Sequence, residues 1–212
     1  MGGWLLVMWG LTWAAAPPLA AARSWVAPFA DGSAGAVVLE ARVNGQGPFR
    51  FLLDTGSART AVSPRMAAAV GAPVVARTTM GSAAGSRELL VVRIDTLEVG
   101  PVLAPDLLAS VVSLDHIDDG DLDGVIGHDV LAAIRYTIDF RERRVAWWPT
   151  DALTARGPTL RVRSSGGRLL LSLPQRDSVL QLVPDTGASA LLLFAPHPAL
   201  PLTLRQETAT LT

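Results

Sequence analysis

The chain has 212 residues, of which 50% are hydrophobic and 17% are charged, and its formal net charge at pH 7 is −1. This length suffices for one or two domains with a buried core. The balanced charge leaves no surplus of basic side chains to hold a phosphate backbone, so we expect no nucleic-acid partner. The absence of cysteine excludes disulfides, thiolate nucleophiles and cysteine-based zinc sites. The three histidines do not pair at metal-ligand spacing, and we expect no metal site.

The first 22 residues have the pattern of a secretory signal peptide. Residues 4–16 form an uncharged, mainly apolar run, and three alanines at residues 20–22 precede Arg23. Such a run followed by an Ala-x-Ala site is typical of cleaved export signals, and it is short for a transmembrane helix. We therefore expect export to the periplasm or out of the cell, with no stable membrane span. An uncleaved N-terminal anchor and a buried helix are the alternatives.

The predicted elements begin after a linker that we expect over residues 23–35. Residues 36–43 alternate, with apolar residues at the odd positions, which predicts a strand. Residues 44–48, Asn-Gly-Gln-Gly-Pro, predict a turn. Residues 49–53 are a second apolar strand that runs directly into Asp54. Asp54 is therefore expected at the end of a buried hairpin strand.

The middle of the chain continues as short elements separated by turn signals. In chain order they are a strand at 60–62, a helix from Ser63-Pro64 to Val70, a small and polar hairpin tip at 78–87, a strand at 89–99, an apolar segment at 102–114 broken by Pro105, a strand at 125–127 after an acidic loop, a short helix at 128–134, and a hairpin of 135–140 with 145–148. Many short strands of this kind predict an all-β domain of barrel or sandwich type, which we place at residues 36–150.

An internal repeat follows this domain. Residues 49–56, Phe-Arg-Phe-Leu-Leu-Asp-Thr-Gly, return as residues 180–187, Leu-Gln-Leu-Val-Pro-Asp-Thr-Gly. We therefore predict a second, duplicated lobe over residues 159–212. The counterpart of Gly127 would fall beyond Thr212, so only the start of that lobe is present. We favour a piece of a longer two-lobed protein, because a half-barrel would have open apolar edges; a lobe shortened in nature is the alternative.

An aspartate that follows an apolar strand and precedes Thr-Gly suits paired-carboxylate chemistry. The glycine leaves room for a second carboxylate and lets backbone N–H groups approach the first. Two carboxylates about 3 Å apart cannot both ionise and share one proton. Such a pair can activate water for attack on a carbonyl group. One Asp-Thr-Gly alone would also fit an ordinary turn, whereas two copies in matching contexts favour the paired site.

Three segments in order resemble the retropepsin-like aspartyl proteases. Asp54-Thr55-Gly56-Ser57-Ala58-Arg59-Thr60 matches the signature Asp-Thr-Gly-Ser/Ala-x-x-Ser/Thr, Val125-Ile126-Gly127 matches the second hydrophobic-hydrophobic-Gly signature, and residues 135–140 are similar to the strand that follows in bacterial members. The resemblance covers roughly residues 36–148. It implies a retropepsin-like acid-protease barrel with one complete lobe and the start of a second. It also implies an aspartic endopeptidase that hydrolyses peptide bonds of polypeptides without a cofactor.

The resemblance also assigns roles to residues. The catalytic carboxylates would be Asp54 and Asp185, the first with more support than the second. The residues expected to support the two loops are Thr55, Gly56, Ser57, Thr186 and Gly187, with Thr55 tying the loops together. The residues expected in the flap are Met80, Gly81, Ser82 and Gly85. Pepsin-like enzymes carry a flap tyrosine, but the only tyrosine here is Tyr136, outside that segment. Ser57, as an additional hydrogen-bond donor beside the pair, suggests an acidic pH optimum.

Two pairings of carboxylates stay open. Asp54 pairs with Asp185 within one chain, or with Asp54 of a second copy in a homodimer. The internal repeat favours the first arrangement. The second copy departs from the signature, because Leu191 replaces the expected Ser or Thr and Pro184 precedes Asp185.

The acidic loop before Gly127 offers a different reading. Asp119, Asp121 and Asp123 alternate before Gly124, as at the opening of a calcium loop. The twelfth position is Val130 and not glutamate, so a solvated acidic turn is the simpler interpretation.

Other features have plain structural interpretations. We assign His128 and Asp129 to the start of a helix and not to a catalytic triad. Residues 141–144 are expected at a charged hairpin tip, and Trp147 and Trp148 in packing. The alternative to an enzyme is an exported binding or structural module that has kept a protease-like fold.

Overall fold

The computed structural model describes residues 25–31, 35–82, 85–115, 117, 121–133, 135–148, 162–174 and 179–188. The predicted signal peptide, residues 1–22, lies outside them. The elements are β1 (Trp25–Pro28), β2 (Ala30–Asp31), β3 (Val37–Val43), β4 (Gln46–Leu53), β5 (Ala61–Val62), α1 (Pro64–Ala69), β6 (Val74–Ser82), β7 (Gly85–Val99), β8 (Val102–Val111), β9 (Gly124–Ile126), α2 (His128–Leu131), β10 (Arg135–Asp139), β11 (Arg144–Trp148), β12 (Val162–Ser165), β13 (Arg168–Pro174) and β14 (Val179–Leu182). Neither helix has the length or the apolar composition needed to cross a bilayer, within the part of the chain described.

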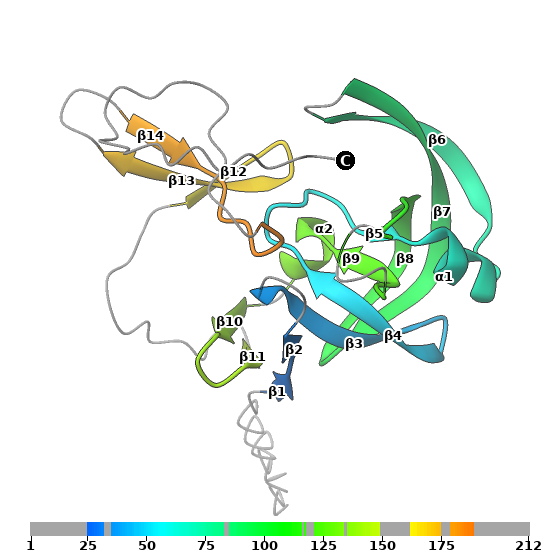
Figure 1. The fold of residues 1–212 in the computed structure, drawn as a ribbon, viewed down its shortest axis with the longest axis horizontal. Coiled ribbons are helices and arrows are strands. Elements are labelled where there is room, and N and C mark those ends of the chain that lie inside the picture. The colour runs from blue at the N-terminus through cyan, green and yellow to red at the C-terminus, as the bar shows by residue number, and fades with distance from the viewer. Residues whose placement is uncertain are drawn as a thin grey trace, which may run out of the picture.

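A β-barrel forms the main body of the molecule (Figure 1). Its strands are hydrogen-bonded in the order β3, β4, β9, β5, β8 and β7, and the ring closes because β3 also pairs with β7. β2 extends the sheet beside β3, and β6 extends it beside β7. The prediction of an all-β barrel is therefore confirmed.

The barrel core follows from the alternation predicted for its first strand. Val37, Leu39, Ala41 and Val43 point into one buried cluster, whereas Val38 belongs to a second cluster on the other face of the sheet. Burial of a set of aliphatic side chains of this kind provides most of the free energy that holds a barrel closed. The register of β4, and with it the position of Asp54 at its end, is fixed by this pairing of inward and outward faces.

The first helix has the predicted boundaries. The side chain of Ser63 accepts a hydrogen bond from the N–H of Met66, and Pro64 occupies the first turn, where it loses no helical hydrogen bond. Gly71, with φ of 63°, follows the end of the helix in the left-handed region that glycine adopts most easily.

The expectation of a linker at residues 23–35 is wrong. β1 pairs antiparallel with β11, with Trp25 opposite Trp147, and β2 pairs with β3. A four-residue strand and a two-residue strand have no periodicity of their own, so their structure comes from the edges of β11 and β3, to which they add.

Pro105 does not break β8 as expected. The strand runs from Val102 to Val111, and its register with β7 is the same on both sides of Pro105. β5 pairs with β8 only at Ser110 and Val111, so Pro105 lies where β8 is an edge strand and needs no N–H donor.

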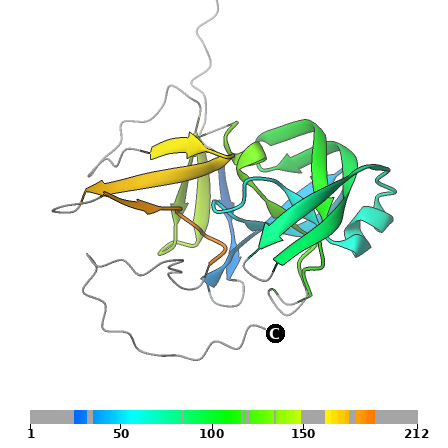
Figure 2. The same ribbon diagram turned by 90° about the horizontal axis from the view of Figure 1, so that it is seen from above.

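The second lobe, as far as it is described, is a three-stranded sheet in the order β12, β13, β14 (Figure 2). β13 and β14 are the counterparts of β3 and β4, as the repeat predicted. The tail from residue 189 onwards, including Leu191, lies outside the described residues.

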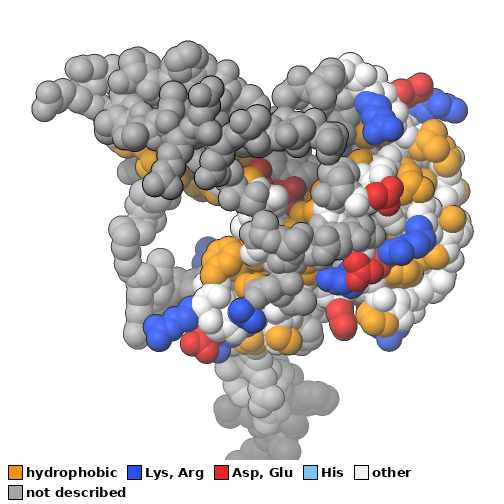
Figure 3. Space-filling view, in the orientation of Figure 1, with side chains coloured by type: hydrophobic (Ala, Val, Ile, Leu, Met, Phe, Trp, Pro, Cys, Tyr) orange, Lys and Arg blue, Asp and Glu red, His pale blue; other side chains and the backbone are white. Residues whose placement is uncertain are grey.

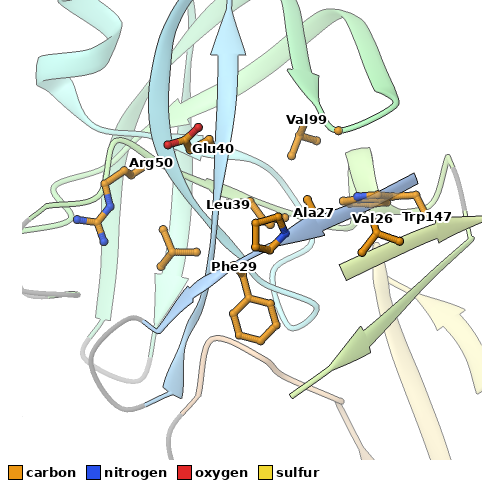
Figure 4. Close-up of a pocket in the computed structure, with 11 residues that line it drawn as sticks. Val26, Ala27, Phe29, Leu39, Glu40, Arg50, Val99 and Trp147 are labelled. Atoms are coloured by element: carbon orange, nitrogen blue, oxygen red, sulfur yellow. The ribbon is translucent and has the colours of Figure 1, made fainter. Parts of the chain in front are cut away.

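A cavity of about 550 Å³ lies between β1 and the barrel (Figure 4). Its walls are mainly apolar and include Val26, Leu39 and Val99, together with Trp147. Trp147 is 1% exposed and belongs to the core cluster. The packing role predicted for Trp147 is therefore confirmed, whereas the side chain of Trp148 lies outside the description.

Candidate active site

Asp54 lies directly after β4, in a loop that the barrel holds from several sides. β9 runs parallel to β4, and the N–H of Asp54 donates a hydrogen bond to the carbonyl of Ile126 at 3.0 Å. The N–H groups of Gly56 and Ser57 both donate to Oδ1 of Asp54, at 2.8 and 3.1 Å. The loop thus turns back on the carboxyl group and fixes its direction.

The second Asp-Thr-Gly forms a similar loop after β14. The N–H of Gly187 donates to Oδ1 of Asp185 at 2.8 Å, as Gly56 does to Asp54. Asp185 is exposed, whereas Asp54 is half-buried. The same local geometry is therefore repeated in a less enclosed setting.

Thr55 and Thr186 join the two loops by reciprocal hydrogen bonds. The N–H of each threonine donates to Oγ1 of the other at 3.1 Å. The hydroxyl of Thr55 donates to the carbonyl of Pro184 at 2.8 Å, and that of Thr186 donates to the carbonyl of Leu53 at 2.6 Å. These four bonds relate the loops by a local twofold symmetry and bring Asp54 and Asp185 together.

Gly56 and Gly187 make this approach sterically possible. A Cβ atom at Gly56 would lie 2.3 Å from Cγ of Asp185, and a Cβ atom at Gly187 would lie 2.9 Å from Cγ of Asp54. Each glycine therefore faces the carboxyl group of the other loop, and any side chain there would push the two apart. Acidic side chains are visible in the hollow between the two lobes (Figure 3).

The pairing changes the acidity of Asp54. Burial raises the pKa of Asp54, and the negative charge of Asp185 and a side-chain hydrogen bond with it raise the pKa further, to about 6. The N–H groups of Gly56 and Ser57 act in the opposite direction, because they stabilise the ionised form. The loop therefore holds a proton on the pair over a pH range in which an ordinary aspartate is ionised.

The predicted role of the Ser57 hydroxyl needs correction. Its Oγ donates a hydrogen bond to the carbonyl of Arg59 at 2.8 Å, and only the backbone N–H of Ser57 reaches Asp54. The hydroxyl is directed along its own loop, since serine side chains readily bond to backbone groups nearby in the sequence. It therefore gives no support for the acidic pH optimum that was inferred from it.

Gly127 and the start of α2 brace the Asp54 loop from below. The N–H of His128 donates to the carbonyl of Ser57 at 2.9 Å. A Cβ atom at Gly127 would lie 2.4 Å from the carbonyl carbon of Arg59, so only glycine fits this crossing.

Asp129 has a role that the sequence analysis missed. Oδ1 of Asp129 accepts hydrogen bonds from both the N–H and the hydroxyl of Thr60, at 2.9 and 2.8 Å. Thr60 is fully buried, and its Oγ1 accepts a bond from the N–H of Gly127. Asp129 therefore stabilises the end of the loop, and not only the helix start to which it was assigned. A buried threonine hydroxyl in the signature was the one available signal that such a partner was needed.

The segment predicted as a flap is the end of the β6–β7 hairpin. Its backbone pairs Met80 with Arg87, Gly81 with Ser86, and Ser82 with Gly85. Residues 83 and 84 lie outside the described residues, and the flap function stays a prediction.

The described part of the acidic loop is engaged by arginines. Asp121 forms an ion pair with Arg50, and Oδ1 of Asp123 lies 3.0 Å from the guanidinium of Arg65. Asp119 is not described, and residues 121–133 with the other described segments contain no group of three acidic or histidine side chains placed to hold a metal ion.

Comparison with known proteins bears on the first lobe. Residues 39–133 match the family model described as "gag-polyprotein putative aspartyl protease". This part of the first lobe is therefore similar to that aspartyl protease family. No curated protein is significantly similar to the chain in sequence. Among solved structures, the crystal structure of a retropepsin-like aspartic protease from Rickettsia conorii is similar to this chain, with 16% sequence identity and a TM-score of 0.44. The similarity covers 59% of this chain and 91% of the Rickettsia chain. The family-model match ends before β10, so it includes Asp54 and Asp129 but not Asp185.

Proposed function

We propose that the chain is an aspartic endopeptidase in which Asp54 and Asp185 of one chain form the catalytic pair. The observation that carries this proposal is the set of four hydrogen bonds that Thr55 and Thr186 make between the two loops, because these bonds hold the two carboxyl groups against each other. The retropepsin-like sequence of the first lobe supports a protease-like function. A purely structural module would have no need of two carboxyl groups that share a proton at a cost in stability.

The reaction follows from the shared proton. Asp54, with a pKa raised to about 6, holds the proton and donates a hydrogen bond to the carbonyl oxygen of the scissile peptide. Asp185 accepts a proton from a water molecule as the water oxygen bonds to the carbonyl carbon. Transfer of the Asp54 proton to the carbonyl oxygen completes a tetrahedral diol. The C–N bond then breaks as the nitrogen takes the proton that Asp185 accepted, and one diol hydroxyl returns its proton to Asp54. The products are a carboxylic acid and an amine, and no covalent enzyme intermediate forms.

The single-chain pair is favoured over a homodimer by the use that the loops make of Pro184. This residue was expected to weaken the second copy because it has no N–H. Pro184, however, lies after the end of β14 at Leu182, and its carbonyl accepts the hydrogen bond from the hydroxyl of Thr55. The Asp185 loop thus already engages the Asp54 loop within one chain, which supports the single-chain pair. The substrate would be a polypeptide covered by the β6–β7 hairpin. Export of the protein is also part of the proposal and is based on the sequence of residues 1–22 alone.

The test is cleavage of an unfolded protein substrate over a range of pH, with and without pepstatin. The parent chain is compared with Asp54→Asn and Asp185→Asn, and Asp139→Asn, in the β10–β11 hairpin, is the matched control. Each of the first two variants is expected to lose activity by about 10²–10⁴-fold or more, since each removes one proton-transfer group. The control is expected to keep it.

Each other outcome has a distinct meaning. If only Asp54→Asn lost activity, the result would indicate that the reacting pair is formed by Asp54 of two chains in a homodimer. A parent chain that is inactive at every pH, although folded, would support the binding or structural module instead.

A further inference from the structure

Arg168, at the start of β13, makes a contact between the lobes that the sequence did not indicate. Its Nε donates a hydrogen bond to the carbonyl oxygen of Gly56 at 3.1 Å. That carbonyl belongs to the same peptide group as the N–H of Ser57, which donates to Oδ1 of Asp54 at 3.1 Å. A single peptide group therefore connects the guanidinium of Arg168 with the carboxyl group of Asp54.

The position of Arg168 is fixed by the turn before it. Ser165 and Arg168 are the closing pair of the β12–β13 hairpin, and Gly166 and Gly167 between them have φ of 59° and 76°. Two residues with positive φ form the tight turn that suits the twist of a hairpin. A Cβ atom at Gly167 would lie 3.1 Å from Cβ of Ala58, so the turn rests on the Asp54 loop. Figures 1 and 2 both show this turn beside the loop after β4.

The contact of Arg168 with the Asp54 loop has no counterpart between the first lobe and the Asp185 loop. The two loops are related by a shift of 131 residues, as in the pair Thr55 and Thr186. The residue 131 positions before Arg168 is Val37, which is fully buried in the barrel core and whose side chain has no hydrogen-bond donor. The cationic contact therefore acts on one member of a pair that is otherwise nearly symmetric.

We infer that Arg168 is a positioning residue that acts on only one carboxyl group of the pair, by polarising the Gly56–Ser57 peptide so that the N–H of Ser57 stabilises the ionised form of Asp54 and limits how tightly Asp54 holds its proton. Hydrogen bonds in series strengthen one another, and a charged donor at one end has the largest effect. This inference rests on the proposed function in so far as Asp54 and Asp185 are the reacting pair. Arg168 itself need not touch the substrate.

The other groups around Asp54 act in known directions. Burial and Asp185 raise the pKa of Asp54, and Asp185 is the one charged side chain among the described residues that contributes to the shift. Arg59, His128 and Asp129 line a cavity of about 450 Å³ beside the Gly166–Gly167 turn. The carboxyl group of Asp129 accepts hydrogen bonds from the N–H and the hydroxyl of Thr60. The inferred action of Arg168 is indirect: it reaches Asp54 through the Gly56–Ser57 peptide, whose N–H lowers the pKa of Asp54, and so opposes the increase that burial and Asp185 cause.

The test measures the titration of Asp54 directly. Carbon-13 is introduced into the aspartate carboxyl groups, and the signal of Asp54 is identified by its loss in Asp54→Asn. The pKa of Asp54 is then compared in the parent, in Arg168→Met and in Arg163→Met. Arg163 is an exposed arginine on the neighbouring strand β12, opposite Leu170, and serves as the control for net charge. Arg168→Met is expected to raise the pKa of Asp54 by about half a unit, and Arg163→Met to leave it unchanged.

A second variant and a second readout complete the test. Arg168→Gln, which keeps a neutral donor, is expected to shift the pKa of Asp54 in the same direction as Arg168→Met. In the pH profile of kcat/KM, the fall in activity on the alkaline side is expected to move to higher pH in the same variants, as the pKa of Asp54 rises. An unchanged or lowered pKa in both Arg168 variants, or an equal increase in Arg163→Met, would overturn the inference. The titration needs no turnover, so its result is separate from a failure of the proposed proteolysis.

Discussion

The two Asp-Thr-Gly loops have the same internal hydrogen bonds, but their surroundings differ. The Asp54 loop follows β4, which pairs with both β3 and β9, and it is braced from below by Gly127 and Asp129. The Asp185 loop follows β14, which among the described strands pairs with β13 alone. The first loop is thus shaped by its own barrel, whereas the second is held mainly by the first loop. Two carboxyl groups in nearly symmetric loops are therefore brought together by one rigid half and one half that depends on it.

The largest expected effect comes from substitutions that fill the space between the two loops. Gly56→Ala would place a methyl group 2.3 Å from Cγ of Asp185, and Gly187→Ala would place one 2.9 Å from Cγ of Asp54. Displacement of a reacting group by about 1 Å costs on the order of 10²-fold in rate. We expect Gly56→Ala to lose at least about that much activity and Gly187→Ala to lose less, because the second loop can yield. The kcat/KM of both variants on one peptide measures this. A larger loss in Gly187→Ala would reverse the assignment of rigid and dependent halves.

The next effect comes from the threonine pair. Thr55→Val and Thr186→Val each remove a hydroxyl that takes part in two of the four bonds. Each change is expected to destabilise the contact between the lobes by about 2–4 kcal/mol, since two bonds are lost and their partners are left without one. Hydrogen exchange of the β12–β14 amides should then increase while that of the barrel stays unchanged. Thr55→Ser and Thr186→Ser keep the hydroxyl and are the controls. Equal exchange in both regions would show that the lobes unfold as one unit.

The same difference explains how far the sequence could predict the structure. The alternation of β3 and the cap at Ser63 are local patterns, and they predicted the barrel strands and α1 correctly. β1 was taken for linker because its strand exists only through pairing with β11, 116 or more residues away in the chain. Asp129 and Arg168 were missed for the same reason, because their partners lie 69 and 112 residues away. The repeat did predict that Asp54 and Asp185 are equivalent, but the Arg168 contact reaches only the Asp54 loop and involves a position where the two copies differ.

The smallest expected effect is a change in the pH dependence of stability, and it distinguishes the two carboxyl groups. The pKa of Asp54 is about 6 in the folded chain, against 3.8 for an ordinary aspartate, so between these values the folded state binds more protons than the unfolded state. The contribution of Asp54 to stability is therefore fully present below about pH 3.8 and is lost as the pH rises through 6. Asn at this position cannot ionise, but it can still accept the bonds from Gly56 and Ser57. We expect Asp54→Asn to stabilise the chain at pH 7 by about 1–2 kcal/mol, a value reduced for the partial exposure of the group, and to have little effect near pH 3.5.

Asp185→Asn should give a weaker form of the same result. It removes the charge that raises the pKa of Asp54, but it leaves the burial of Asp54, which is the larger cause, in place. The pH range over which the chain loses stability through ionisation of Asp54 should therefore become narrower in Asp185→Asn. In Asp54→Asn this loss should be absent. Thermal unfolding of the parent and both variants from about pH 3 to pH 8, compared as differences at each pH, cancels the contributions of the other carboxylates. If Asp185→Asn removed the window completely, repulsion between the two charges and not the enclosure of Asp54 by the barrel would set the proton on the pair.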